Sequence, residues 1–298
     1  MRDAAYTRHA CRTQARHGRP DLTHMSAKIF SAVLAAAICM ALAIPAPAMA
    51  QSAPNAGQPD TGQSVSRADL VNLLGRLHED GEVRQDLAAL GFAGEKLELA
   101  VRHAADMLSD PVIAGYIADR VLAVRDNRTP PIARAQGLLW SVIDEGLGHL
   151  PLRDLRYYYS VEKVVLSAMP VRTCGRAVRG DLAPARMAEA TARAAARLNV
   201  EGLRNYYRIQ LRAAQLGAQR GAKRLPPQRA AQAEAAIFGV VTRTISARED
   251  AARLMGSFAN LERASARDAC IAGQVFIEAV LTLEGRELND ALIQLSTP

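Results

Sequence analysis

The sequence lacks the motifs that mark the common enzyme classes. It has six histidines, and those after residue 50 (His78, His103 and His149) fall into no HExxH or other metal-binding spacing. No GxSxG elbow, phosphate-binding loop or glycine-rich dinucleotide loop occurs. The signatures of zinc peptidases, α/β-hydrolases, nucleotide hydrolases and dinucleotide-dependent oxidoreductases are therefore missing, and we expect no metal and no cofactor.

The pattern of a β-strand is almost missing as well. Aromatic residues make up 4% of the chain, and alternating runs of β-branched and polar residues are rare. Alanine is abundant instead, and it has the highest helix propensity. No repeat of about 34 or 40 residues indicates a solenoid. We therefore expect an all-α protein, a compact multi-helix array of about nine to eleven helices.

The one long uncharged run lies near the N-terminus, at Ile29–Ile44. Lys28 precedes it, and Ala48–Ala50 supplies the small residues that signal peptidase requires. The alternative is a transmembrane anchor, but the run is shorter than the roughly 20 apolar residues of a membrane span. We expect a signal peptide over residues 25–50, cleaved between Ala50 and Gln51. The protein is then periplasmic or secreted, with no transmembrane anchor after cleavage.

The segments on either side of this leader have no apolar periodicity. Residues 1–24 contain five arginines, which is unusual before a signal peptide, and Met25 would give an ordinary start. We therefore expect residues 1–24 to be a non-native extension. Residues 51–64 are rich in Gly, Pro, Gln and Ser, which predicts a disordered linker. A helical domain follows over 65–298, with a soft boundary near 129–151.

Short segments predict where helices begin and where the chain is irregular. Ser66–Asp69 and Ser265–Asp268 have the pattern of a capping box, in which a serine and an acidic residue satisfy the first N–H groups of a helix. Ser246–Glu249 resembles a helix cap too. Val171–Leu182 contains two glycines and a cysteine, so we expect an irregular stretch there.

The basic character of the chain comes mostly from its leader. Residues 1–50 carry six Lys or Arg and two Asp or Glu, so +4 of the net charge of +7 lies there and +3 remains in residues 51–298. A charge of that size is ordinary for a globular domain. The pI of about 9.5 is therefore no sign of nucleic-acid binding, and we consider a nucleic-acid partner unlikely.

Two cysteines remain after the leader, Cys174 and Cys270. Exported chains form disulfides, and an even count favours one intramolecular bridge between these two. Two buried thiols or a bridge to a partner are the alternatives. Neither cysteine has a CxxC partner or a nearby histidine, so their spacing does not suggest a metal site.

An arginine face is the most specific surface feature. Between Glu201 and Glu234 there is no acidic residue, and Arg204, Arg208 and Arg212 repeat every four residues, so they line one side of a helix. With Tyr207 beside them, they form a candidate contact surface for an anionic partner. The alternative is a solvated face, or pairing with the acidic C-terminal helices that contain Glu278, Glu284, Glu287 and Asp290.

Two further groups are weaker candidates. Tyr157–Tyr159 and Tyr206–Tyr207 hold five of the seven tyrosines. Since neighbours on a helix point about 100° apart, we expect one of each set in the core and another exposed. His149 follows Asp144 and Glu145 in a glycine-rich turn, where it is either a general base or an ordinary surface residue.

We expect an exported helical binding or interaction protein of the cell envelope, with the arginine face as its contact surface. Its partner would be an envelope protein or an anionic lipid or polysaccharide. The alternative is an envelope hydrolase or lyase with an unrecognised acid/base site, for example His149. A purely structural role is a third reading. A deep pocket with converging buried polar groups would favour the enzyme, and a flat face of basic and aromatic side chains would favour the binding protein.

Overall fold

The computed structural model describes residues 65–77, 81–123 and 131–297. The expected start at Met25, the signal peptide of residues 25–50 with its Ala50–Gln51 cleavage site, and the linker of residues 51–64 all lie outside them. The described residues are all helical with no strand, which confirms the all-α prediction, and they form thirteen α-helices, more than the expected nine to eleven.

The first helices in the chain are α2 (Arg67–Arg76), α3 (Gly81–Ala89), α4 (Glu95–Ser109), α5 (Pro111–Ala123), α6 (Pro131–Leu147) and α7 (Leu152–Ala168). The rest are α8 (Val171–Arg179), α9 (Pro184–Ala195), α10 (Val200–Arg220), α11 (Pro227–Ser246), α12 (Ala251–Ala259), α13 (Ala266–Leu281) and α14 (Gly285–Leu295). A short 3₁₀ turn, η3 (Leu261–Arg263), precedes α13.

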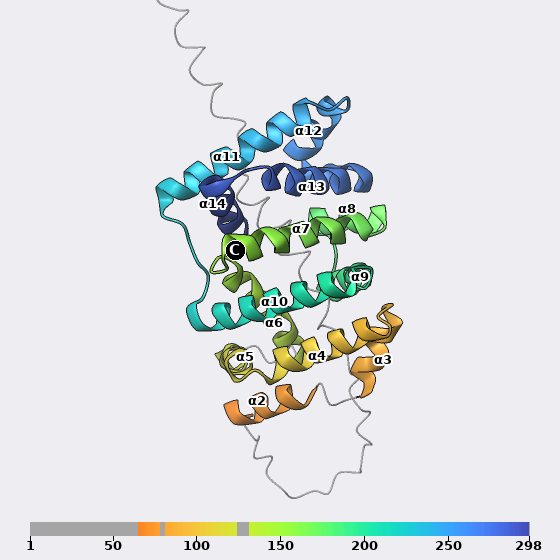
Figure 1. Cartoon of the computed structure of the whole chain (residues 1–298), viewed down its shortest axis with the longest axis vertical. Helices are drawn as coiled ribbons and strands as arrows, with labels where there is room; N and C mark the ends of the chain where they lie inside the picture. Colours follow the sequence, from red (N-terminus) through yellow and green to blue (C-terminus); the bar gives the residue numbers. More distant parts are fainter. Residues whose placement is uncertain (1–64, 78–80, 124–130, 298) are drawn as a thin grey trace, which may run out of the picture.

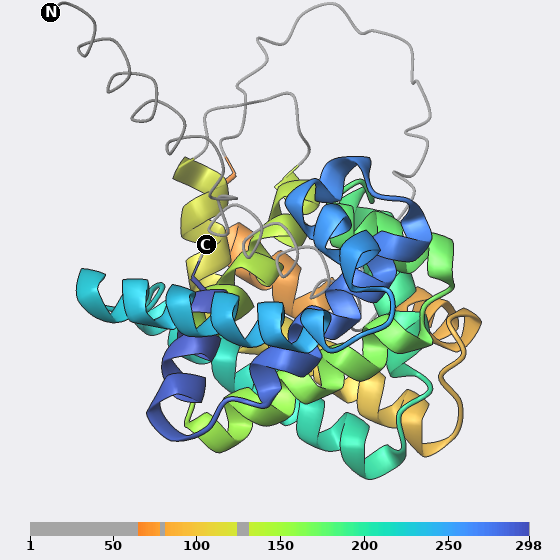
Figure 2. The ribbon, with the colours of Figure 1, turned by 90° about the horizontal axis from the view of Figure 1, so that it is seen from above.

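The helices are stacked in layers along the long axis of the molecule, from α2 at one end to α11 and α12 at the other (Figure 1). Helices of neighbouring layers cross at an angle when viewed down that axis (Figure 2). The order of the layers is not the order of the chain, because α10 packs between α4 and α7, and α13 packs between α7 and α11. One continuous apolar core runs through the whole stack.

Helix α10 is the central element of this arrangement. It begins at the N-cap Asn199, whose side chain accepts a hydrogen bond from the Gly202 N–H, and it ends where Gly221 takes a positive φ of 65°. Between these ends it contacts α4, α5, α6 and α7. It therefore joins helices from both sides of residues 129–151, and the soft boundary expected there stays a prediction.

Glycine allows α6 and α10 to cross at very short range. A Cβ atom on Gly146 would lie 1.7 Å from the carbonyl oxygen of Ala213, and one on Gly217 would lie 1.9 Å from that of Val142. Only residues without a side chain fit there, so each helix backbone rests directly on the other. This crossing fixes the position of the C-terminal half of α10.

A second close crossing joins α8 to α13. Cys174 and Cys270 form the predicted disulfide, with their sulfur atoms 2.08 Å apart. Beside it, a Cβ atom on Gly175 would lie 1.9 Å from the carbonyl oxygen of Ala266. The irregular stretch expected at Val171–Leu182 is wrong for Val171–Arg179, which is helical, and is confirmed only for residues 180–182. Gly175 serves helix packing there instead of breaking the helix.

The predicted caps have mixed outcomes. Ser66 and Asp69 form the expected capping box, and the Ser265 hydroxyl accepts a hydrogen bond from the Asp268 N–H at 3.1 Å. The cap expected at Ser246–Glu249 is wrong, because Ser246 is the last residue of α11 and Asp250 precedes α12 without a side-chain cap. Within the described part of the chain, no helix has both the length and the apolarity to span a bilayer.

Candidate functional site

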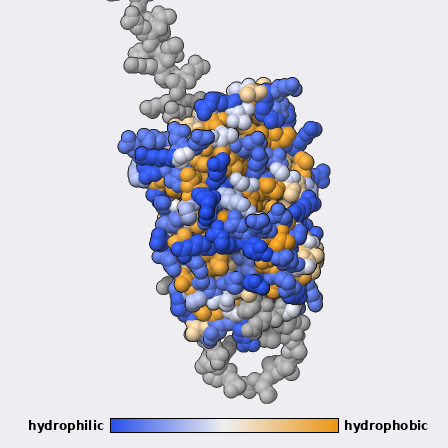
Figure 3. Space-filling model, viewed as in Figure 1, coloured by the Kyte–Doolittle hydropathy of each residue, from blue (hydrophilic) through white to orange (hydrophobic). Residues whose placement is uncertain are grey.

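The arginine face lies exposed on α10, and a strongly hydrophilic band crosses the molecule at the level of this helix (Figure 3). Arg204 pairs with Glu95 of α4 at 2.6 Å. Arg208 donates to both oxygens of Asp154 on α7, at 3.2 and 3.4 Å. The expected alternative, pairing with the acidic C-terminal helices, is therefore wrong for these two arginines.

Two of the four acidic residues of the C-terminal helices, Glu278 and Asp290, have other partners. Glu278 pairs with Lys163 of α7 at 3.2 Å. Asp290 pairs with Arg229 of α11, which belongs to the same acid-free stretch, so pairing with the C-terminal helices is confirmed for that arginine. Asp290 also pairs with Arg286 of its own helix. These pairs hold α13 and α14 to their neighbouring helices, so these acids act within the fold and away from the arginine face.

Tyr207 does not belong to the contact surface, which corrects the prediction. Its side chain is 4% exposed, and its ring stacks on His103 of α4 with the centroids 4.1 Å apart. Tyr206 is buried too, so neither member of the Tyr206–Tyr207 pair reaches the surface. The reason is that α10 is covered by helices on several sides, and two neighbouring positions 100° apart both face the core.

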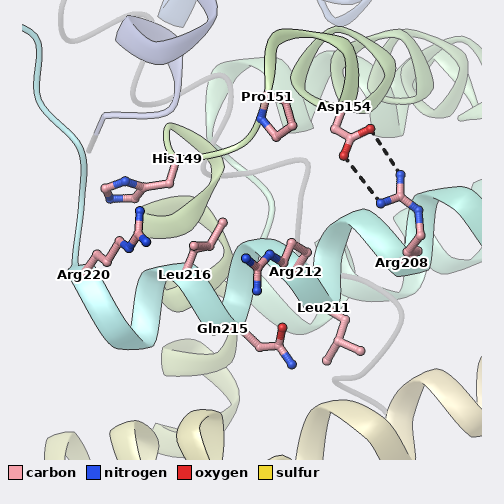
Figure 4. Close-up of a pocket in the computed structure, with 9 residues that line it drawn as sticks. All are labelled: His149, Pro151, Asp154, Arg208, Leu211, Arg212, Gln215, Leu216 and Arg220. Atoms are coloured by element: carbon pink, nitrogen blue, oxygen red, sulfur yellow. Dashed lines mark hydrogen bonds and ion pairs between the residues drawn. The ribbon is translucent and has the colours of Figure 1, made fainter.

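A pocket of about 490 Å³ opens beside the C-terminal half of α10 (Figure 4). The turn between α6 and α7 contributes His149 and Pro151, α7 contributes Asp154, and the remaining side chains come from α10. The α10 residues that line it are Arg208, Leu211, Arg212, Gln215, Leu216 and Arg220. His149 and Arg220 lie at one end, Asp154 and Arg208 at the other, and Arg212 between them.

The pocket has an excess of positive charge. Three arginines face it together with one carboxylate, Asp154, which is already bound by Arg208. Arg212 and Arg220 are exposed, and among the described residues neither has an acidic partner. Guanidinium groups in this state are available for a carboxylate or a phosphate, which they bind with two parallel N–H donors.

One backbone feature adds to this charge distribution. Pro151 is the N-cap of α7, and no side chain caps that helix end. The first N–H groups of a helix have no acceptor within it, so the positive end of the α7 dipole lies at the rim of the pocket. The side chain of Gln215 is held by Asp110, to which it donates at 2.9 Å.

His149 has a positioning role in the fold. Its Nε2 atom donates to the carbonyl oxygen of Gly221 at 3.0 Å, which ties the turn before α7 to the end of α10. The carboxylates that precede it have other surroundings: Glu145 accepts from Tyr116, and burial and the neighbouring Glu162 raise the pKa of Asp144. Within the described structure, His149 has no carboxylate partner that would make it the base of a catalytic pair.

A separate buried polar cluster lies between α6, α7 and α10. It consists of Asp144, Tyr158, Tyr159, Glu162 and Tyr206, and burial raises the pKa of each. None of its members lines the pocket. Sequence reasoning had no signal for this cluster, because its acids and tyrosines meet only through the packing of three helices.

Arg220 was also missed as a site residue. Successive steps of four residues drift by about 40° around a helix, so Arg220 lies about 80° from Arg212 and about 160° from Arg204. The spacing alone therefore gave no reason to group Arg220 with Arg204, and it is the pocket that brings Arg220 together with Arg212.

Comparison with family models, curated protein sequences and solved structures finds no match to the chain. The functional argument therefore depends on the geometry alone.

Proposed function

We propose that the protein is an exported helical binding protein of the cell envelope, and that its pocket beside α10 holds an anionic group of an envelope component. The observation that carries this proposal is the contrast along one helix. Arg204 and Arg208 are neutralised by Glu95 and Asp154, whereas Arg212 and Arg220 face a pocket with no carboxylate for them. The contact surface thus shifts from Arg204 and Tyr207 toward Arg220.

The dimensions and the lining support a group larger than a free ion. A volume of about 490 Å³ falls within the roughly 300–1,000 Å³ of small-molecule sites. Leu211, Leu216 and Pro151 give part of the wall an apolar surface. We infer a phosphate or carboxylate attached to a larger body, as in the headgroup of an anionic lipid or a unit of an acidic polysaccharide.

Two features support a location outside the cytoplasm. The apolar segment before residue 50 has the pattern of a signal peptide. The disulfide between Cys174 and Cys270 is of the kind that persists in oxidising compartments. A periplasmic or secreted protein would meet anionic lipids and polysaccharides there.

The test uses the exported protein with vesicles of phosphatidylglycerol, compared with phosphatidylcholine vesicles and with free glycerol phosphate. We expect salt-dependent binding to the anionic probes, and the double substitution R212E/R220E should weaken it at least tenfold because it replaces both free cations by anions. Binding to vesicles alone would identify the lipid surface as the source of the anion, and competition by glycerol phosphate would identify the headgroup.

The matched control is R172E/R267E. Arg172 on α8 and Arg267 on α13 are exposed and have no acidic partner in the described structure, so this pair makes the same change in net charge outside the pocket. If the control weakens binding as much as R212E/R220E, the attraction is general and the proposed pocket is wrong. Capture of an envelope protein with no binding to either anionic probe would replace the ligand by a protein partner.

No observation favours the alternative of a hydrolase or lyase. The converging polar groups that such an enzyme would need are present in the buried cluster, but the pocket is lined by other residues. Within the pocket, the one carboxylate is bound by Arg208 and the one histidine by a backbone carbonyl. The pocket therefore offers donors for an anion and no free base.

A further inference from the structure

The interface between α7 and α10 contains a carboxyl group with no counter-charge. Glu162 of α7 is 0% exposed. Its Oε1 atom accepts a hydrogen bond of 2.6 Å from the Tyr206 hydroxyl of α10. Its Oε2 atom has no hydrogen-bond partner in the described structure. Tyrosine is a neutral donor, so nothing in this contact balances a negative charge on Glu162.

The surroundings of Glu162 are aromatic and acidic. The Tyr158 ring stacks on Tyr206 with the centroids 5.6 Å apart, and it meets Tyr159 edge to face at 5.7 Å. Asp144 of α6 approaches from the third helix, and its charge would repel a charge on Glu162. A second carboxyl therefore makes an ionised Glu162 less favourable still.

The cations of the helices that pack on α7 are paired with other acids or face elsewhere. Arg212 and Arg220 of α10 face the pocket, which Glu162 does not line, and Arg267 of α13 is exposed. Lys163 pairs with Glu278 of α13. On α9, both Arg186 and Arg193 pair with Glu189. On α14, Arg286 pairs with Asp290, and on α10 Arg208 pairs with Asp154. No ion pair in the described structure includes Glu162.

An isolated carboxylate in such a place is costly, because transfer from water without a compensating charge favours the neutral acid. We propose that Glu162 is a proton-binding site that joins α7 to α10: the neutral acid accepts the Tyr206 hydrogen bond within the packed interface, and loss of its proton drives the two helices apart. This inference does not depend on the anion pocket.

The direction of the proton equilibrium agrees with this geometry. Burial raises the pKa of Glu162 from 4.5 to about 8, against the hydrogen bond from Tyr206, which lowers it. The folded protein thus holds a proton that the unfolded chain has released above its own pKa. The stabilisation is complete below pH 4.5 and is lost as the pH rises toward 8.

Amide hydrogen exchange of the full mature chain tests this proposal. The measurement compares α7 and α10 in wild type and in Glu162→Gln, which keeps the shape and stays neutral. After correction for intrinsic exchange, the ratio of the opening constants, wild type to E162Q, should rise roughly tenfold per pH unit between pH 5 and 8 and level off above. Making the same comparison in the Asp144→Asn background removes the titration of Asp144, whose pKa depends on the charge of Glu162. A ratio that does not change with pH would overturn the proposal.

A second measurement keeps the proposal testable if E162Q does not fold. Infrared titration of the Asp144→Asn variant removes the other buried carboxyl of the cluster. We expect the carbonyl band of a protonated carboxyl to remain at pH 7, where exposed carboxyls are ionised, and to disappear as the pH rises through about 8. A folded D144N protein with no such band at pH 7 would show that Glu162 is ionised and that no proton joins the helices.

Discussion

The α8–α13 and α6–α10 crossings use the same packing device with different reinforcement. In both, glycines bring the helix backbones together so closely that a Cβ atom would overlap the opposite chain. The α8–α13 crossing is also joined by the Cys174–Cys270 disulfide. The α6–α10 crossing has no covalent link, and the buried polar cluster and the pocket both lie along its helices. The region with the polar groups is therefore held by non-covalent contacts alone.

Because of this difference, the two crossings should respond to different perturbations. A crossing with a disulfide tolerates the loss of single contacts, because the covalent bond keeps the two helices together. A crossing that depends on packing responds to any change in shape or charge at its interface. We expect the α6–α10 region to respond to mutation and pH, and the α8–α13 region to respond to reduction.

Removal of the disulfide should have the largest effect. The bridge closes a loop with a sequence separation of 96, for which chain entropy predicts about 4.7 kcal/mol of stabilisation. We expect C174S/C270S to lower the free energy of unfolding by about that amount in urea titrations. The wild-type protein under reducing conditions should lose as much, and equal stability of the oxidised and reduced forms would contradict this expectation.

Gly217→Ala should have the next largest effect, because the new Cβ meets the backbone of α6 at Val142 and not a movable side chain. We expect a loss of about 3 kcal/mol in the free energy of unfolding. Gly256→Ala on α12 is the matched control, since nothing lies within 4 Å of its added Cβ. That variant should be stabilised by about 0.5–1 kcal/mol through helix propensity. Equal effects of the two substitutions would show that the crossing is not tight.

The smallest effect, counted per pH unit, should be the loss of stability when the pH is lowered. It should arise at the contact between α4 and α10. His103 is buried against Tyr207, and its Nε2 donates to Gln210. Burial lowers its pKa from 6.5 to about 3, against the Gln210 hydrogen bond, which raises it. The unfolded chain takes up a proton below pH 6.5 and the folded protein does not, so stability falls as the pH falls from 6.5 toward 3.

The variant His103→Gln isolates that contribution. Between pH 6 and 4, wild type should lose about 1.4 kcal/mol per pH unit relative to H103Q in the free energy of unfolding. Parallel curves for the two proteins would mean that His103 is charged in the fold. The sign is opposite to that of Glu162, so acid should weaken the α4 side of α10 and alkali its α7 side.

The sequence was informative where the signal is local. Capping at Ser66 and Ser265 and the all-helical fold follow from short patterns, and the disulfide follows from the two cysteines left after the leader. Local sequence patterns gave a wrong prediction where tertiary packing determines the structure. Gly175 and its neighbours indicate an irregular stretch by propensity, but in the fold that glycine admits α13 and the helix continues.

The candidate site shows the same division. The spacing of Arg208 and Arg212 placed both on one side of a helix, and the structure places both at the pocket. Which arginines are neutralised depends on Glu95 and Asp154, both remote in sequence, and no local pattern contains that information. Periodicity predicts which residues share one side of a helix. It does not predict how many neighbouring helices cover that side, so the surface position expected for Tyr207 is wrong.

The central position of α10 has a consequence for how the protein is made. A chain synthesised from its N-terminus completes α4, α5, α6 and α7 before the helix that packs against all four exists. Their apolar surfaces stay without their native cover until residue 220 has emerged. Contacts of such long sequence separation slow folding and expose intermediates to aggregation. We expect chains truncated before Val200 to remain bound to chaperones, and chains that extend through Gly221 to be released.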